Sequence, residues 1–136
     1  AGHLNQPAAF CPYQHVFDAL AAYLWIAMLQ NEDKKYQGEY NIGPDIEQTM
    51  QTCELVEKMQ KYLDFDWENT GKSIGKESNY LTLNNEKIKS VGWAPVYSTN
   101  DLVVEAVSKW YNKFMQGKDM QKVTIEQIKE AFNSYE

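Results

Sequence analysis

His15 is the residue with the most chemical potential in this chain, because an imidazole gains and loses a proton near neutral pH. It stands at the start of an apolar run, and no Ser or Cys nucleophile partner is evident for it. A histidine in that setting is more often a hydrogen-bonded structural residue than a catalyst. From its own residues, the sequence therefore identifies no catalytic group.

Three carboxylates, Asp64, Asp66 and Glu68, are spaced two residues apart. In a strand this spacing places them on one face, where they could bind a cation or simply face solvent. We favour the solvated face, and we predict no metal site; neither Cys11 nor Cys53 belongs to a metal-binding spacing.

Gly71 and Gly75 alternate with Lys72 and Lys76 in a segment that could cradle a phosphate. The spacing is not that of a Walker motif, so the signal is weak. We expect residues 69–79 to form a mobile loop.

The composition limits the kinds of partner. The 136 residues carry a net charge of −6, and all thirteen basic residues are Lys. Nucleic acids and anionic membranes need a basic surface, so we expect neither as a partner. The sequence shows no secretory signal and no apolar run long enough to cross a bilayer, which favours a cytoplasmic protein with reduced thiols.

The elements that must position these residues follow from hydrophobic periodicity and helix caps. We predict one mainly helical α+β domain over residues 1–136, with residues 1–9 irregular or partly added for expression. A helix over 16–30 is apolar nearly all round and therefore needs partners on several sides. The other expected helices cover 45–59, 84–91, 102–114 and 124–132, and the expected strands cover 39–42, 64–68 and 80–83.

Several motifs in register resemble one family. Pro12-Tyr13-Gln14-His15-Val16 is similar to Pro-Trp-Gln-His-Val, Tyr40-Asn41-Ile42-Gly43-Pro44 to Trp-Asn-Phe-Gly-Pro, and Val91-Gly92-Trp93-Ala94-Pro95 to Leu-Gly-Trp-x-Pro. Glu77 followed by Tyr80-Leu81-Thr82-Leu83-Asn84, the Trp110-Tyr111 pair and the segment 117–128 extend the match. These motifs resemble the C-terminal portion of CDP-glucose 4,6-dehydratases, which are extended short-chain dehydrogenase/reductases.

The resemblance implies a two-lobed parent, in which NAD is bound by a Rossmann lobe and a nucleotide sugar by a smaller C-terminal lobe. This sequence lacks the Gly-rich phosphate turn and a matching Tyr-x-x-x-Lys pair, so we expect no NAD site and no activity in this chain alone. By resemblance, Gln14, His15 and Glu77 are the candidates for contacting a CDP-hexose. Cys11 stands where the family has an Arg that binds the diphosphate, which weakens that expectation.

The expected function is thus the substrate-binding part of a sugar-nucleotide 4,6-dehydratase-like protein, serving deoxysugar and lipopolysaccharide biosynthesis. Two partners remain open for the apolar helix 16–30: a missing Rossmann lobe, or further copies of the chain in an oligomer. In the latter case the chain would be a non-enzymatic interaction module derived from the same fold.

Overall fold

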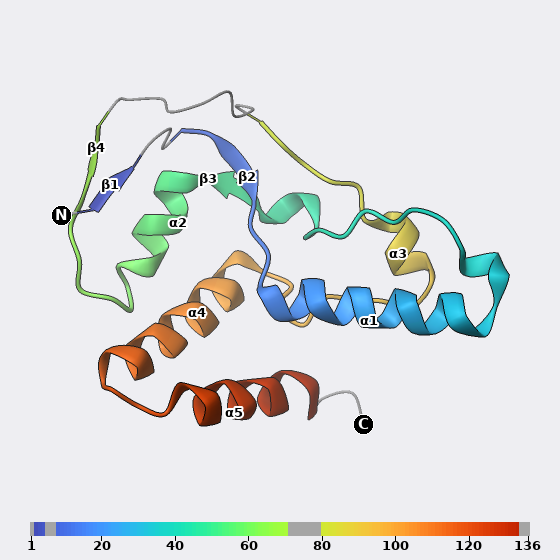
Figure 1. Ribbon diagram of the computed structural model, residues 1–136. Coiled ribbons are helices and arrows are strands. Elements are labelled where there is room, and N and C mark those ends of the chain that lie inside the picture. Colours follow the sequence, from blue (N-terminus) through green and yellow to red (C-terminus); the bar gives the residue numbers. More distant parts are fainter. Residues whose placement is uncertain (1, 5–7, 71–79, 134–136) are drawn as a thin grey trace.

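The computed structural model describes residues 2–4, 8–70 and 80–133, and Figure 1 shows the order of their elements along the chain. The helices are α1 (Val16–Glu32), α2 (Thr52–Met59), α3 (Glu86–Ser90), α4 (Asn100–Met115) and α5 (Met120–Phe132), with two 3-10 turns, η1 (Lys34–Tyr36) and η2 (Ile46–Gln48). The strands are β1 (Gly2–Leu4), β2 (Phe10–Pro12), β3 (Thr49–Gln51) and β4 (Trp67–Asn69). The chain is a mainly helical α+β structure, as its sequence predicts.

Helix α1 packs on α3 through a stripe of residues three and four apart. Ala22 and Ile26 of α1 form a buried cluster with Ile88 of α3 and with Trp93, which follows α3. The indole of Trp25 donates to the carbonyl of Val91 at 2.9 Å and so fixes the end of α3 against α1. Figure 1 shows α3 beside the middle of α1.

Gly92 ends α3, as predicted, because its φ of 99° lies in the left-handed region. A Cβ at this position would also lie 3.1 Å from the ring of Trp25. Glycine is therefore required both by the turn and by the close approach of α1.

Four short strands form two separate pairs. Antiparallel β2 and β3 place Cys11 opposite Met50, and parallel β1 and β4 place Gly2 opposite Trp67. Phe10 also forms a parallel bridge with Tyr80. Because β2 is paired directly before α1 begins, the segment from Tyr13 to His15 is anchored at both ends.

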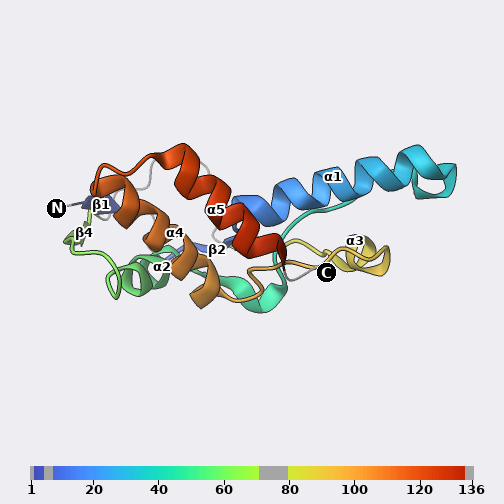
Figure 2. The same ribbon diagram turned by 90° about the horizontal axis from the view of Figure 1, so that it is seen from below.

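Helices α4 and α5 form a hairpin whose turn contains Gly117, at φ 68°. The indole of Trp110 donates to Thr124 Oγ1 at 3.1 Å, and Gln127 Nε2 donates to the carbonyl of Ala106 at 3.1 Å. Helix α2 packs on the other side of α4, where Asn112 Nδ2 donates to the carbonyl of Tyr62. In Figure 2 this hairpin and α1 extend to opposite sides of the molecule.

The prediction of one helix over 45–59 is wrong. Residues 46–48 form η2, the next three form β3, and α2 begins only at Thr52. The pairing of β3 with β2 takes Met50 out of the helix and buries it. Gln51 and Glu54 then form a capping box, which provides the start signal for α2.

Two predicted strands are also absent from the described residues. Residues 39–42 have no strand partner there, although Tyr40 and Ile42 still pack on the α1–α3 cluster, and in 80–83 only Tyr80 forms a bridge. The alternation predicted for 64–68 is confirmed by burial, but ladder pairing begins only at Trp67. Residues 1–9 are expected to be irregular, but Gly2–Leu4 of this segment form β1. Strand β2 begins directly after it, at Phe10.

The caps of the last two helices differ from the predicted ones. Thr99 rather than Ser98 caps α4, since its hydroxyl accepts from the Leu102 N–H at 3.2 Å. Asp119 caps α5 and accepts from the N–H groups of Gln121 and Lys122, so this helix begins at Met120 rather than at 124.

None of the helices in the described ranges has the length and apolar character needed to span a membrane.

Candidate functional site

His15 joins the start of α1 to the rest of the molecule. It is the N-cap residue of α1, with extended backbone angles, and its Nδ1 accepts from the Phe17 N–H at 3.1 Å. Only 5% of its surface is exposed. Because Nδ1 is an acceptor, a neutral ring carries its proton on Nε2, which remains a hydrogen-bond donor.

Tyr97 lies against His15 and is held by α1 from a second direction. The two rings stack with their centroids 4.1 Å apart. Asp18, in the first turn of α1 and only 1% exposed, accepts from the Val96 N–H at 2.7 Å and from the Tyr97 N–H at 3.1 Å. We call His15, Asp18, Val96 and Tyr97 the α1 junction.

The environment of the α1 junction shifts its ionisable groups. Burial lowers the pKa of His15, which favours the neutral imidazole. Burial raises the pKa of Asp18, and the N–H groups of Val96 and Tyr97 oppose that rise. The pKa of Tyr97 is also raised, first by burial and then by the charges of Asp18 and Glu130.

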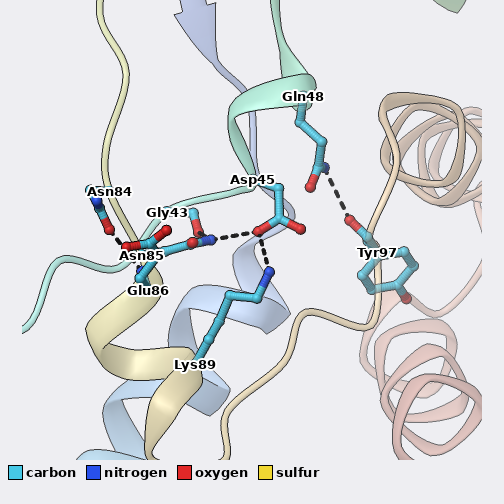
Figure 3. Close-up of polar contacts among 8 residues, drawn as sticks. All are labelled: Gly43, Asp45, Gln48, Asn84, Asn85, Glu86, Lys89 and Tyr97. Carbon is cyan, nitrogen blue, oxygen red and sulfur yellow. Dashed lines mark hydrogen bonds and ion pairs between the residues drawn. The ribbon is translucent and has the colours of Figure 1, made fainter.

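A second polar group lies beside the junction and is drawn in Figure 3. Asn85 Nδ2 donates to the carbonyl of Gly43 at 3.0 Å and to Asp45 Oδ1 at 2.8 Å, and Lys89 Nζ is 2.8 Å from the same carboxylate oxygen. Lys89, followed by the Asn85 amide, lowers the pKa of Asp45. We call Gly43, Asp45, Asn85 and Lys89 the Asp45 cluster.

Gln48 connects the two groups. It is the last residue of η2, the turn that begins directly after Asp45, and it is buried. Its Nε2 donates to the carbonyl of Tyr97 at 3.2 Å. Figure 3 shows Gln48 reaching Tyr97 from the turn that also carries Asp45. Three chain segments distant in sequence therefore meet at Tyr97: the start of α1, η2, and the loop before α4.

A cavity of about 370 Å³ opens beside the Asp45 cluster. Its lining includes the carboxylates of Asp45, Glu47 and Glu86, against the single amine of Lys89. That balance disfavours an anionic diphosphate and suits neutral hydroxyl and amide groups. A larger groove of about 620 Å³ lies between α4 and α5 and reaches Tyr97. Its charged lining consists of Lys and Glu side chains of α4 and Glu side chains of α5.

We compared the chain with known proteins once this geometry was clear, and no family model matches it. In an alignment of 121 residues that covers 86% of the chain, it is 29% identical to the CDP-glucose 4,6-dehydratase of Salmonella typhimurium (strain LT2). The chain resembles part of a CDP-glucose 4,6-dehydratase. The match covers 33% of that enzyme, so the chain spans about a third of the length of this relative.

The similarity confirms the family resemblance drawn from the sequence motifs, and it is consistent with a C-terminal portion of a CDP-glucose 4,6-dehydratase. The motif at 12–16 corresponds in the structure to the anchored segment that runs into α1. The motif at 91–95 ends α3 and leads to the loop that the α1 junction holds.

The structure places two of the three predicted site residues, Gln14 and His15, next to each other at the start of α1. The side-chain nitrogen Nε2 of Gln14 is buried and has no hydrogen-bond partner among the described residues. Glu77 lies outside the described residues, so its part in the site stays a prediction. Cys11 is a half-buried free thiol on β2.

Sequence reasoning missed the residues that hold this site together. Asp18 had a recognisable signal, because it is the one charged residue among 16–30 and shares its helix stripe with Ala22 and Ile26. Gln48, Asn85 and Tyr97 had none, since their roles depend on contacts more than 40 residues apart in sequence.

The three carboxylates that alternate along 64–68 face solvent. Asp64, Asp66 and Glu68 are all exposed, while Phe65 and Trp67 between them are half-buried. Within the ranges that the structure describes, no three His, Cys, Asp or Glu side chains converge in a way that could hold a metal ion.

Proposed function

We propose that this chain is the nucleotide-sugar-binding part of a CDP-glucose 4,6-dehydratase-like protein and has no activity alone. The observation that carries the proposal is the similarity to such an enzyme over 86% of the chain, with the predicted Gln14–His15 segment held between β2 and α1. The ligand class that we propose is a CDP-hexose, bound through its neutral groups.

The Gln14 amide supports this assignment. A buried donor without a partner costs about 1–3 kcal/mol, so such a group is usually completed by water or a ligand. A hydroxyl or carbonyl oxygen of a nucleotide sugar would be a suitable acceptor. Gln14 precedes the N-cap of α1, and its backbone is therefore fixed before any ligand arrives.

His15 would act as a neutral donor rather than as an acid. Its lowered pKa keeps the imidazole uncharged at neutral pH, and the bond from Phe17 to Nδ1 leaves the proton on Nε2. The stack on Tyr97 fixes the orientation of the His15 ring, and the hydrogen bond that Asp18 accepts from the Tyr97 N–H holds Tyr97 in place. Glu77 is proposed as a third contact, on the family resemblance.

We expect weak binding of the diphosphate. The sequence has no Arg, and Cys11 cannot make charge-assisted hydrogen bonds to a phosphate. The affinity should therefore come from the sugar and the base, and a dissociation constant on the order of 1 mM, or about −4 kcal/mol, is expected.

In the whole protein we place this part in the cytoplasm, in the synthesis of deoxysugar nucleotides for surface polysaccharides. The residues of this chain do not fit NAD, because the sequence has no Gly-rich phosphate turn. We therefore derive no hydride step here and assign the chain a role in binding the sugar alone.

Calorimetric titration of the full chain with CDP-glucose tests the proposal. Saturable heat at millimolar ligand, reduced at least about fivefold in affinity by Gln14→Ala, is expected for the loss of one ligand hydrogen bond. Gln116→Ala is the matched control, because Gln116 is exposed at the end of α4. An absence of heat with CDP-glucose, or an equal effect of both variants, would contradict the proposed site.

A further inference from the structure

Two side chains near the start of α1 each carry a polar atom that has no partner. Gln14 Nε2 and Thr49 Oγ1 are both shielded from solvent, and neither has a hydrogen-bond partner among the described residues. A buried polar group without a partner destabilises the fold, so water or a ligand usually completes it. Thr49 lies in β3, outside the sequence motifs, the α1 junction and the Asp45 cluster.

The pairing of β2 with β3 brings these two side chains to one place. Thr49 lies directly opposite Pro12, and Gln14 follows Pro12 by two residues. Residues two apart on a strand share a face, so Gln14 is a diagonal neighbour of Thr49, at a spacing of about 7–8 Å that long side chains can bridge. The alternation continues past Pro12, because the hydroxyl of Tyr13 lies 2.7 Å from that of Thr52, which is on the opposite face.

The chemistry of the two atoms selects the group that can lie between them. The amide nitrogen of Gln14 only donates, whereas the hydroxyl of Thr49 can donate or accept. A ligand hydroxyl satisfies both, since it accepts from the amide and donates to the Thr49 oxygen. Both side chains are only half-buried, and the terminal torsion of Gln is soft, so the two polar atoms can turn toward a ligand without a change in the backbone.

We propose that Thr49 is a further binding residue of the site, and that Thr49 and Gln14 together hold one hydroxyl group of the nucleotide sugar. This inference rests on the proposed function and adds to it the group of the ligand that is bound. Strand β3 fixes the Thr49 backbone beside the segment that leads into α1, so both residues are in place before the ligand arrives.

Thr49→Val should change affinity and stability in different directions. The substitution keeps the shape of the side chain and removes the unpaired hydroxyl, so the urea midpoint of the ligand-free chain should stay the same or rise. The affinity for CDP-glucose, measured from the chemical shifts of the ¹⁵N-labelled chain, should fall at least about threefold. Thr49→Ser retains the hydroxyl and should bind as the unaltered chain does.

Thr124→Val is the matched control for this experiment. It removes a hydroxyl on α5 that accepts from the indole of Trp110, so the urea midpoint should fall and the affinity for CDP-glucose should not change. The double variant Gln14→Ala, Thr49→Val tests whether the two residues hold one group. Its loss of affinity should be smaller than the product of the two single losses.

The outcomes separate this inference from the function on which it rests. If the unaltered chain shows no shift changes at about 20 mM CDP-glucose, the proposed function fails and the Thr49 contact fails with it. If Gln14→Ala weakens binding and Thr49→Val does not, the proposed function stands and the Thr49 contact is wrong. A lower urea midpoint of Thr49→Val with unchanged affinity, or independent losses in the double variant, would also overturn the inference.

Discussion

The α1 junction holds the start of α1 on the loop before α4, whereas the Asp45 cluster holds the segment before η2 on α3, and the two do so with different physics. In the junction, Asp18 is almost fully buried and its carboxylate accepts from the backbone N–H groups of Val96 and Tyr97. In the Asp45 cluster, the carboxylate is partly exposed and faces a Lys amine and the Asn85 amide. Burial raises the pKa of Asp18, whereas the cationic partner lowers that of Asp45.

This difference indicates where a substitution should cost the fold the most stability. A buried acceptor cannot be removed without leaving its donors unpaired, whereas an exposed ion pair is replaced by water at little cost. The α1 junction should therefore determine the position of the Gln14–His15 segment. The Asp45 cluster should mainly shape the neighbouring cavity.

The largest effect is expected for Asp18→Asn. The amide retains one acceptor oxygen, but its NH₂ group would face the N–H of Val96 or Tyr97. We expect the free energy of unfolding to fall by about 2–4 kcal/mol, measured by urea denaturation. Asp66→Asn, at an exposed position of the same residue type, is the control and should change stability little. Equal stability of the two variants would show that the junction does not hold α1.

Asn85→Ala should have the next largest effect. Asn85 is 6% exposed, and its side chain satisfies the carbonyl of Gly43 and one oxygen of Asp45. We expect a loss of about 1–2 kcal/mol in the same denaturation assay. Asn84→Ala is the comparison, since Asn84 is exposed and its oxygen accepts from the local Glu86 N–H. If Asn84→Ala were the more damaging change, the cluster would be misassigned.

The pH dependence of stability separates the two regions further. The pKa of His15 is lowered in the folded state, so below about pH 6.5 the unfolded chain binds more protons. The stability contributed by neutral His15 is thus complete above pH 6.5 and is lost as the pH falls. Protonation at Nδ1 would also remove the cap on Phe17.

We expect the free energy of unfolding to decrease between pH 7.5 and 5.5, with a slope of at most about 1.4 kcal/mol per pH unit from this group. His15→Gln should reduce the slope. His3→Gln removes the other histidine of the chain and should leave the slope unchanged. A slope that depends on His3 instead would contradict the role assigned to His15.

Lys89→Ala should have the smallest effect. The Lys89 side chain is 42% exposed, and its amine pairs with the Asp45 carboxylate, which also accepts from Asn85. We expect a loss of at most about 0.5 kcal/mol, which disappears in 1 M salt because exposed charges are screened. A loss as large as that for Asn85→Ala would mean that the two regions do not differ as described.

The sequence predicts a helix well where apolar residues recur at helical spacing and a glycine or another helix-ending residue follows them. Helix α1 follows its apolar run, α3 ends at Gly92, and α4 keeps its periodicity up to the turn at Gly117. The same reasoning fails for 45–59, because the pairing of Thr49–Gln51 with β2 is a long-range contact that overrides local helical spacing.

The candidate site is only partly predictable for the same reason. Gln14 and His15 are identified by a short motif, and their adjacency is given by the chain itself. The residues that fix them, Asp18 and Tyr97, are 79 positions apart, and only the folded chain brings them together. Periodicity indicates that Asp18 is on the buried stripe, but it does not indicate which N–H groups it accepts from.

The central claim is that the Gln14–His15 segment contacts a nucleotide sugar. The most direct test is to map the chemical-shift changes of the ¹⁵N-labelled chain, backbone and side-chain amides included, during titration with CDP-glucose. The account predicts saturable changes at the Gln14 side-chain amide, at His15 and at Tyr97. No change at millimolar CDP-glucose, or changes confined to the groove between α4 and α5, would contradict it.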